Sequence, residues 1–128
     1  MRYYHSRTLT VPFALAVERA VSALKIEGFG VLTDIDVRKT LKDKIGVEFR
    51  NYRILGACNP QLAHQALELE DKVGTMLPCN VIVQDIGDGR VEIAAIDPVA
   101  SMAAIDNPKL KEAAAQVREK LRKAVDSL

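Results

Sequence analysis

The stretch from Met76 to Pro98 constrains the fold most strongly, because it predicts a β-hairpin. Two runs rich in Val and Ile flank Asp88-Gly89, a pair that tolerates the positive φ angles of a type I′ turn. A tight turn of this kind joins antiparallel neighbours. Any fold of this chain must therefore contain an antiparallel pair of strands in its second half.

The two-residue turn also predicts which residues face each other across the hairpin. In that register Ile82 pairs with Ala95, and Asn80 pairs with Asp97. The polar pair then lies at the open end of the hairpin, beside Cys79. We expect a site, if the chain has one, at this end of the sheet.

The rest of the chain alternates between strand-like and helix-like periodicity. Further strands are predicted at residues 2–9, 30–37 and 52–57, while residues 47–51 alternate weakly and are left open as another strand. Helices are predicted at residues 11–27, 37–45, 60–69 and 108–127, with a short apolar turn or helix at 99–105. Asn-Pro pairs start the helices at 60 and 108, with Asn as the N-cap and Pro in the first turn.

This order, β-α-β-α-(β)-β-α-β-β-α, predicts an α+β fold. We expect one domain over residues 1–128, with a mixed or antiparallel sheet whose helices pack mainly on one face. A chain of 128 residues is long enough to form a core without disulfides or metals.

Composition argues against several partners and compartments. The net charge of +1 and the aromatic content of 5% give no case for a nucleic-acid surface. No apolar run approaches the ~20 residues that span a bilayer, so no membrane partner is expected. Two cysteines without an apolar signal segment predict a reducing, cytoplasmic location.

The two cysteines are the first candidates for chemistry. Cys58 lies where a strand meets the helix that starts at Asn59-Pro60, and Cys79 lies at the entry of the hairpin. If their strands are neighbours, both thiols could reach one spot and act as a redox pair or as a nucleophile with a resolving partner. The alternative is that both are small buried hydrophobic residues, and their spacing matches no redox motif.

Other catalytic and cofactor motifs are missing from the sequence. His5 and His64, together with the two cysteines, supply metal-ligand types, but nothing in their spacing predicts that they converge. There is no dinucleotide-binding glycine motif, phosphate loop or Gly-x-Ser-x-Gly. The sequence therefore predicts neither a metal site nor a cofactor.

Several motifs together resemble a known family. They are Gly28–Val31 with Asp34–Val37, Tyr52–Pro60, Leu77–Val81 and Asp97-Pro98. The chain resembles, over nearly its whole length, the prokaryotic family of domains of unknown function numbered 302. The resemblance implies a compact α+β fold, similar to a single TATA-binding-protein-like unit with extra elements, and a homodimer. It implies no activity, substrate or cofactor, and a shared fold would not transfer DNA binding.

The leading functional hypothesis is a cytosolic, homodimeric module that binds a small ligand. The expected pocket lies at the family's Cys-Asn-Pro and Leu-Pro-Cys motifs, with Asn59 as a donor and Asp97 as an acceptor. Its candidate residues are Cys58, Asn59, Pro60, Cys79, Asn80 and Asp97.

Two alternatives belong to other classes of protein. The first is a thiol enzyme or redox protein that uses Cys58 or Cys79 as its reactive sulfur. The second is a structural or partner-binding dimer without pocket chemistry. The sequence does not decide whether the protein is an enzyme, although it favours a protein without catalytic activity.

Overall fold

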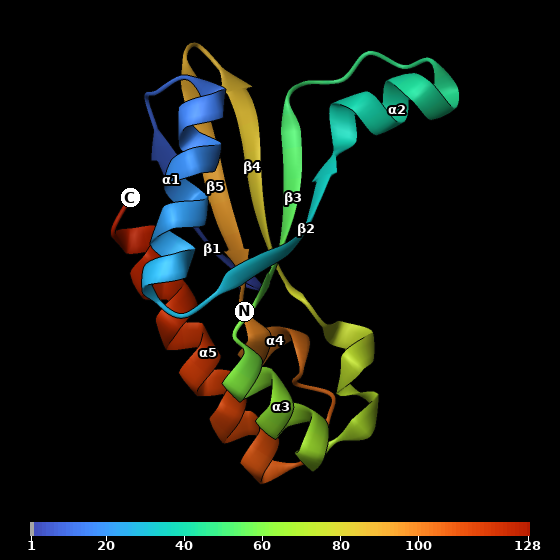
Figure 1. Ribbon diagram of the computed structural model, residues 1–128, viewed down its shortest axis with the longest axis vertical. Coiled ribbons are helices and arrows are strands. Elements are labelled where there is room, and N and C mark those ends of the chain that lie inside the picture. The colour runs from blue at the N-terminus through green and yellow to red at the C-terminus, as the bar shows by residue number, and fades with distance from the viewer. Residues whose placement is uncertain (1) are drawn as a thin grey trace.

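Five antiparallel strands form the sheet of the computed structural model, in the spatial order β1-β5-β4-β3-β2 (Figure 1). The structure describes residues 2–128. The strands are β1 (Tyr4–Leu9), β2 (Gly30–Asp36), β3 (Tyr52–Cys58), β4 (Cys79–Gly87) and β5 (Arg90–Ile96). The predicted α+β fold is confirmed, and the sheet is antiparallel throughout.

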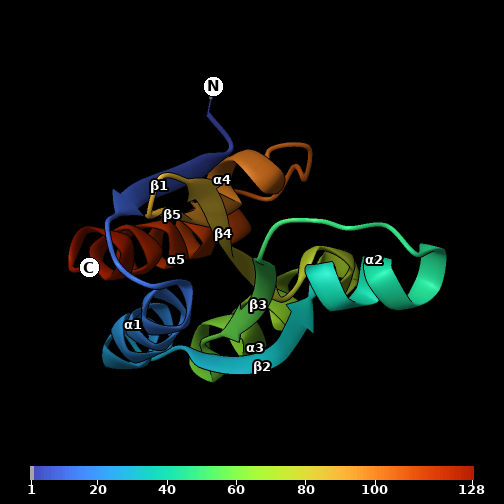
Figure 2. The ribbon, with the colours of Figure 1, turned by 90° about the horizontal axis from the view of Figure 1, so that it is seen from above.

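Two long helices cover one face of the sheet. These are α1 (Phe13–Ile26) and α5 (Pro108–Asp126), and both lie on the same side of the strands (Figures 1 and 2). Each helix carries an apolar stripe, so that Leu24 of α1 and Leu121 of α5 are buried in the main core. In the part of the chain that the structure describes, no helix covers the opposite face of the sheet (Figure 2).

The remaining helices lie beyond the ends of the strands. The helix α3 (Pro60–Leu69), the 3₁₀ helix η1 (Asp71–Met76) and the short α4 (Pro98–Ser101) gather beside the first turns of α5 (Figure 1). They share a second, smaller core that includes Val73, Met102 and Leu110. The helix α2 (Val37–Ile45) projects from the other end of β2, away from α1 and α5.

Local capping signals are confirmed at both Asn-Pro pairs. The side chain of Asn59 accepts a hydrogen bond from Leu62 N at 3.2 Å, and that of Asn107 accepts one from Leu110 N at 3.1 Å. In both helices Pro occupies the first turn, where its missing N–H leaves no bond unmade. These short sequence signals fix where α3 and α5 begin.

The turn of the hairpin has the predicted backbone conformation. Asp88 has a φ of 55° and Gly89 a φ of 73°, so both central residues are left-handed as a type I′ turn requires. Gly87 is left-handed as well, with a φ of 87°. The β4–β5 pair is therefore present where the sequence predicted it.

The predicted register of the hairpin is wrong by one residue. Ile82 pairs with Ala94 rather than with Ala95. The ladder shifts close to the turn, where Ile86 is an extra residue on β4 and forms a β-bulge. The extra residue moves every pair beyond it by one position.

The segment left open as a further strand, residues 47–51, forms no strand in the structure. It links α2 to β3.

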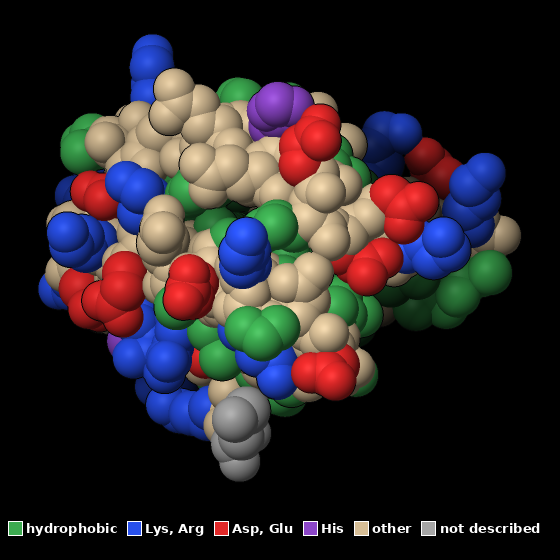
Figure 3. Space-filling model, turned by 90° about the horizontal axis from the view of Figure 1, so that it is seen from below, with side chains coloured by type: hydrophobic (Ala, Val, Ile, Leu, Met, Phe, Trp, Pro, Cys, Tyr) green, Lys and Arg blue, Asp and Glu red, His purple; other side chains and the backbone are tan. Residues whose placement is uncertain are grey.

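Among residues 2–128, none of the helices combines the length and the apolar character that a membrane crossing requires. At the end of the molecule formed by the smaller helices, side chains of both charges are interspersed with apolar ones (Figure 3).

Candidate functional site

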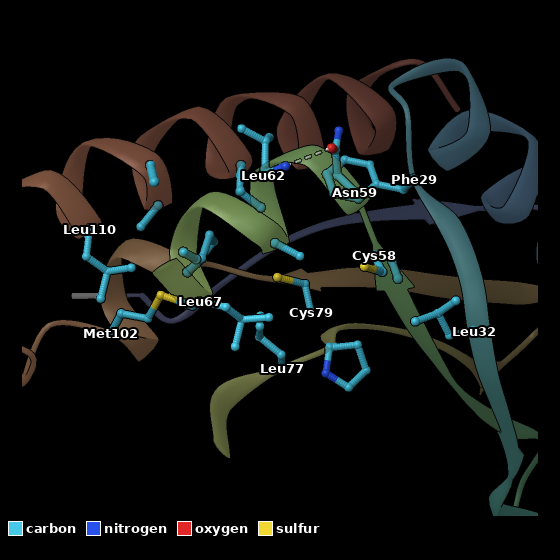
Figure 4. A pocket seen from close by; sticks show the side chains of 18 residues that line it. Phe29, Leu32, Cys58, Asn59, Leu62, Leu67, Leu77, Cys79, Met102 and Leu110 are labelled. Atoms are coloured by element: carbon cyan, nitrogen blue, oxygen red, sulfur yellow. Dashed lines mark hydrogen bonds between the residues drawn. The ribbon is translucent and has the colours of Figure 1, made fainter. Parts of the chain in front are cut away.

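A cavity of about 250 Å³ lies where the ends of β3 and β4 meet α3 and α5 (Figure 4). Its walls come from segments far apart in the sequence. They are Phe29 and Leu32 from β2 and the turn before it, 57–59, 62, 63, 66 and 67 from β3 and α3, 77–79 before and within β4, Pro98 and Met102 around α4, and 110, 113, 114 and 117 from α5.

The chain turns sharply at this place for local reasons. The strand β3 passes directly into α3, because Asn59 caps the helix. Gly28 ends the preceding helical segment with a φ of +88°, and a Cβ there would lie 3.0 Å from Asn59 Nδ2. The glycine therefore serves both as a left-handed residue and as space for the Asn59 side chain.

The walls of the cavity are almost entirely apolar. Among residues 2–128, only Asn59 and the two thiols give the wall polar side chains, and no charged side chain of these residues lines it. Leu32 is 68% exposed and Leu67 is 42% exposed, although both line the cavity. These two residues therefore mark the side on which the cavity meets solvent.

Three of the six candidate site residues line this cavity and three do not. Cys58, Asn59 and Cys79 are on its wall, whereas Pro60, Asn80 and Asp97 are not. The structure thus brings the Cys-Asn and Leu-Pro-Cys motifs to one cavity.

The three others are directed elsewhere by the backbone. Pro60 occupies the first turn of α3. Side chains alternate along a strand, so Asn80 points to the face of the sheet opposite Cys79 and lines a separate hollow there. The predicted pairing of Asn80 with Asp97 is excluded by the shifted register.

Asp97 is buried and acts within the fold. Its Oδ1 accepts hydrogen bonds from Val99 N at 2.9 Å and Ala100 N at 3.4 Å, which caps α4. Its Oδ2 lies 3.2 Å from Arg118 Nε on α5. Both oxygens therefore have partners from the chain itself, and this placement does not support a role as ligand acceptor.

The two thiols differ in environment. Both are free; Cys58 is half-buried and Cys79 is buried. Burial, and to a smaller extent the nearby Cys58, raises the pKa of the Cys79 thiol to about 11. Cys79 is thus protonated at neutral pH and is a poor nucleophile. In the ladder Cys79 pairs with Ala57 rather than with Cys58, so the two cysteines are not directly opposite.

Most of the wall was not foreseen from the sequence. Leu62, Leu110 and Ala114 lie at apolar positions of α3 and α5, and Met102 follows α4, and none of them belongs to a site motif of the sequence. Helical periodicity shows that such residues face inward, but not which helices meet. A cavity between α3 and α5 follows from tertiary packing, for which the sequence carries no local signal.

Within residues 2–128, no three His, Cys, Asp or Glu side chains lie close enough together to hold a metal ion. His5 instead contacts Asp126 at 2.7 Å, and His64 contacts Glu68 at 3.3 Å. The four residues considered as metal ligands are therefore divided between three places.

Comparison with known proteins adds the family but no activity. The crystal structure of an uncharacterised conserved DUF302 protein from Bacillus stearothermophilus superimposes with a TM-score of 0.90. The two sequences are 31% identical, and the match covers 98% of each chain. No curated protein matches the chain. The family model described as "Domain of unknown function DUF302" matches residues 5–128, so the chain belongs to the DUF302 family.

Proposed function

We propose that this protein is a cytosolic binding module that takes a small apolar ligand into the cavity between α3 and α5. The observation that carries the proposal is the apolar wall of the cavity, to which the described part of the chain contributes no charged side chain. Its volume of about 250 Å³ is close to the lower end of small-molecule sites, roughly 300–1,000 Å³. Apolar cavities of even about 150 Å³ bind ring compounds such as benzene.

Asn59 is the residue that would orient such a ligand. Its Oδ1 is engaged by Leu62 N, whereas none of the hydrogen bonds among residues 2–128 uses its Nδ2. A ligand with one acceptor on an otherwise apolar body would match this wall. Asn59 therefore remains the proposed donor, and the thiol of Cys58 lies beside it on the wall.

A cytosolic location and a homodimer belong to the same proposal. Both cysteines are free, which fits a reducing compartment. The face of the sheet opposite α1 and α5 is uncovered, which fits a protein that associates with another copy. A thiol enzyme is less well supported, since the pKa of Cys79 is raised rather than lowered.

The test is binding of a neutral apolar probe, 1-aminoanthracene, followed by its fluorescence. We expect saturable binding by the wild type, and weakening by at least about tenfold in Ala63→Phe, whose ring would occupy the cavity. The control is Ala115→Phe, which places the same ring on the exposed side of α5. Melting temperatures of both variants show whether either substitution disturbs the fold.

A second readout links the probe to the cavity itself. Bound 1-aminoanthracene should slow alkylation of Cys58 in the wild type, since this thiol lines the cavity. The proposal is refuted if the wild type does not bind the probe, or if both Phe variants bind it as well as the wild type does.

A further inference from the structure

The uncovered face of the sheet carries an apolar row that runs across four strands. Ala94 pairs with Ile82, Ile82 with Ile54, and Ile54 with Ile35. The exposed face of an antiparallel sheet usually carries polar residues in alternation with the buried ones. Apolar side chains in this row are therefore typical of a surface that another molecule covers.

The same face is hollowed next to this row. A hollow of about 370 Å³ is lined by Ile82, Ala94 and Ile96, with Tyr4 on one side and Tyr52 on the other. The hollow spans β1, β5, β4 and β3, which is three strand spacings, or roughly 14 Å. It is thus wide enough for a short helix.

The helix α2 is a short helix whose apolar stripe is only partly covered by its own chain, since Val37 and Leu41 are half-buried and Ile45 is exposed. Val37, Leu41 and Ile45 recur at helical spacing, but α2 buries none of its residues. Ile45 is 67% exposed. A helix of nine residues is about 13 Å long, which matches the width of the hollow, and it is too short to be stable without packing.

The helix and the hollow also complement each other in charge. Lys44 on α2 has no ion-pair partner among residues 2–128, and neither has Glu92 on the rim of the hollow. Glu92 Oε1 accepts a hydrogen bond from Gln84 Nε2 at 2.8 Å, which fixes the carboxylate in place. One chain therefore offers a free cation on the projecting helix and a free anion beside the hollow.

We propose that two copies of this chain associate through these surfaces, with α2 of each copy in the hollow of the other. The inference rests on the homodimer in the proposed function and names its interface. The hollow lies on the face of the sheet opposite α1 and α5, because its residue Ile82 alternates with the covered Val81 and Val83. The helix α2 also lies away from α1 and α5 (Figure 2). A two-fold axis makes both contacts at once, since each copy supplies one helix and one hollow.

The first test measures the dimer dissociation constant by analytical ultracentrifugation. Ile45→Asp should weaken the dimer by at least about tenfold, because it places a carboxylate in an apolar interface. The matched control is Ile26→Asp, which changes an 81% exposed residue at the end of α1 and should leave the dissociation constant within about twofold.

The second test uses a charge exchange that only a reciprocal contact can satisfy. Lys44→Glu and Glu92→Lys should each weaken their own homodimer, because each brings like charges together. An equal mixture of the two variants should form a heterodimer more tightly than either variant dimerises alone. Circular dichroism of each variant verifies that it is folded.

The outcomes separate this interface from the homodimer itself. A wild type that stays monomeric at high micromolar concentration refutes both the homodimer and the interface. A wild-type dimer that survives Ile45→Asp unchanged refutes only the interface. A charge-exchange mixture that gains nothing over the separate variants also refutes the reciprocal contact.

Discussion

At the scale of single residues, Gly56 shows how tightly the strands are packed where β3 approaches the cavity. A Cβ at this position would lie 2.1 Å from Thr33 Oγ1 and 2.7 Å from Pro78 Cγ. Gly56→Ala should therefore cost about 1–3 kcal/mol of unfolding free energy, since the neighbours must move. Gly30→Ala is the control, because no atom lies within 4 Å of a Cβ there. Urea unfolding gives the free energy of unfolding of both variants. An equal loss of stability in Gly56→Ala and Gly30→Ala would contradict the prediction.

Cys79 makes stability depend on pH in the alkaline range. Its pKa is raised from 9.0 to about 11, chiefly by burial, so the folded state holds this proton more tightly than the unfolded state does. The contribution is complete below pH 9 and is lost as the pH rises through about 11. The wild type should therefore lose stability relative to Cys79→Ala over this range. The measurement is the free energy of unfolding of both proteins at a series of pH values. A difference between the two proteins that stays the same at every pH would refute the prediction.

At the scale of elements, Asn107 does more than begin a helix. Besides capping α5, its Nδ2 donates a hydrogen bond to Leu69 O at 3.0 Å and so ties the end of α3 to the start of α5. Asn107→Ala should cost about 1 kcal/mol for the cap and about as much again for the lost tie. Asn59→Ala removes only a cap and should cost about half as much. Thermal unfolding compares the two, and equal effects would show that the tie contributes nothing.

The hairpin shows which features of an element the sequence can predict. Asp88-Gly89 specifies the turn locally, and the structure confirms it. The bulge is set by tertiary packing: it allows Val83 of β4 to share the covered face with Ile93 of β5, while Gln84 faces the uncovered side. The predicted register would have set Gln84 beside Ile93. The burial that decides between these registers depends on α1 and α5, which lie outside the hairpin.

At the scale of the whole molecule, the order of strands and helices was enough to predict an α+β domain with helices mainly on one face. The sequence placed Cys58 and Cys79 near one another only on condition that their strands are neighbours, and the structure meets that condition because β3 pairs with β4. It could not place Asp97, which is held by its own helix cap and by Arg118 on α5. The apolar character of the cavity likewise depends on a contact between α3 and α5 that no local pattern encodes.

The edge strand β1 has a consequence for how the protein is made. Among the described strands its only neighbour is β5, and His5 on β1 contacts Asp126, which lies 121 positions later in the chain. A ribosome produces β1 before the other four strands, and all of them must emerge before β1 finds its partner β5. During this interval an extended segment with unpaired backbone groups is available to neighbouring nascent chains. We therefore expect this protein to aggregate more when it is synthesised at high local concentration than when the full-length chain refolds in dilute solution.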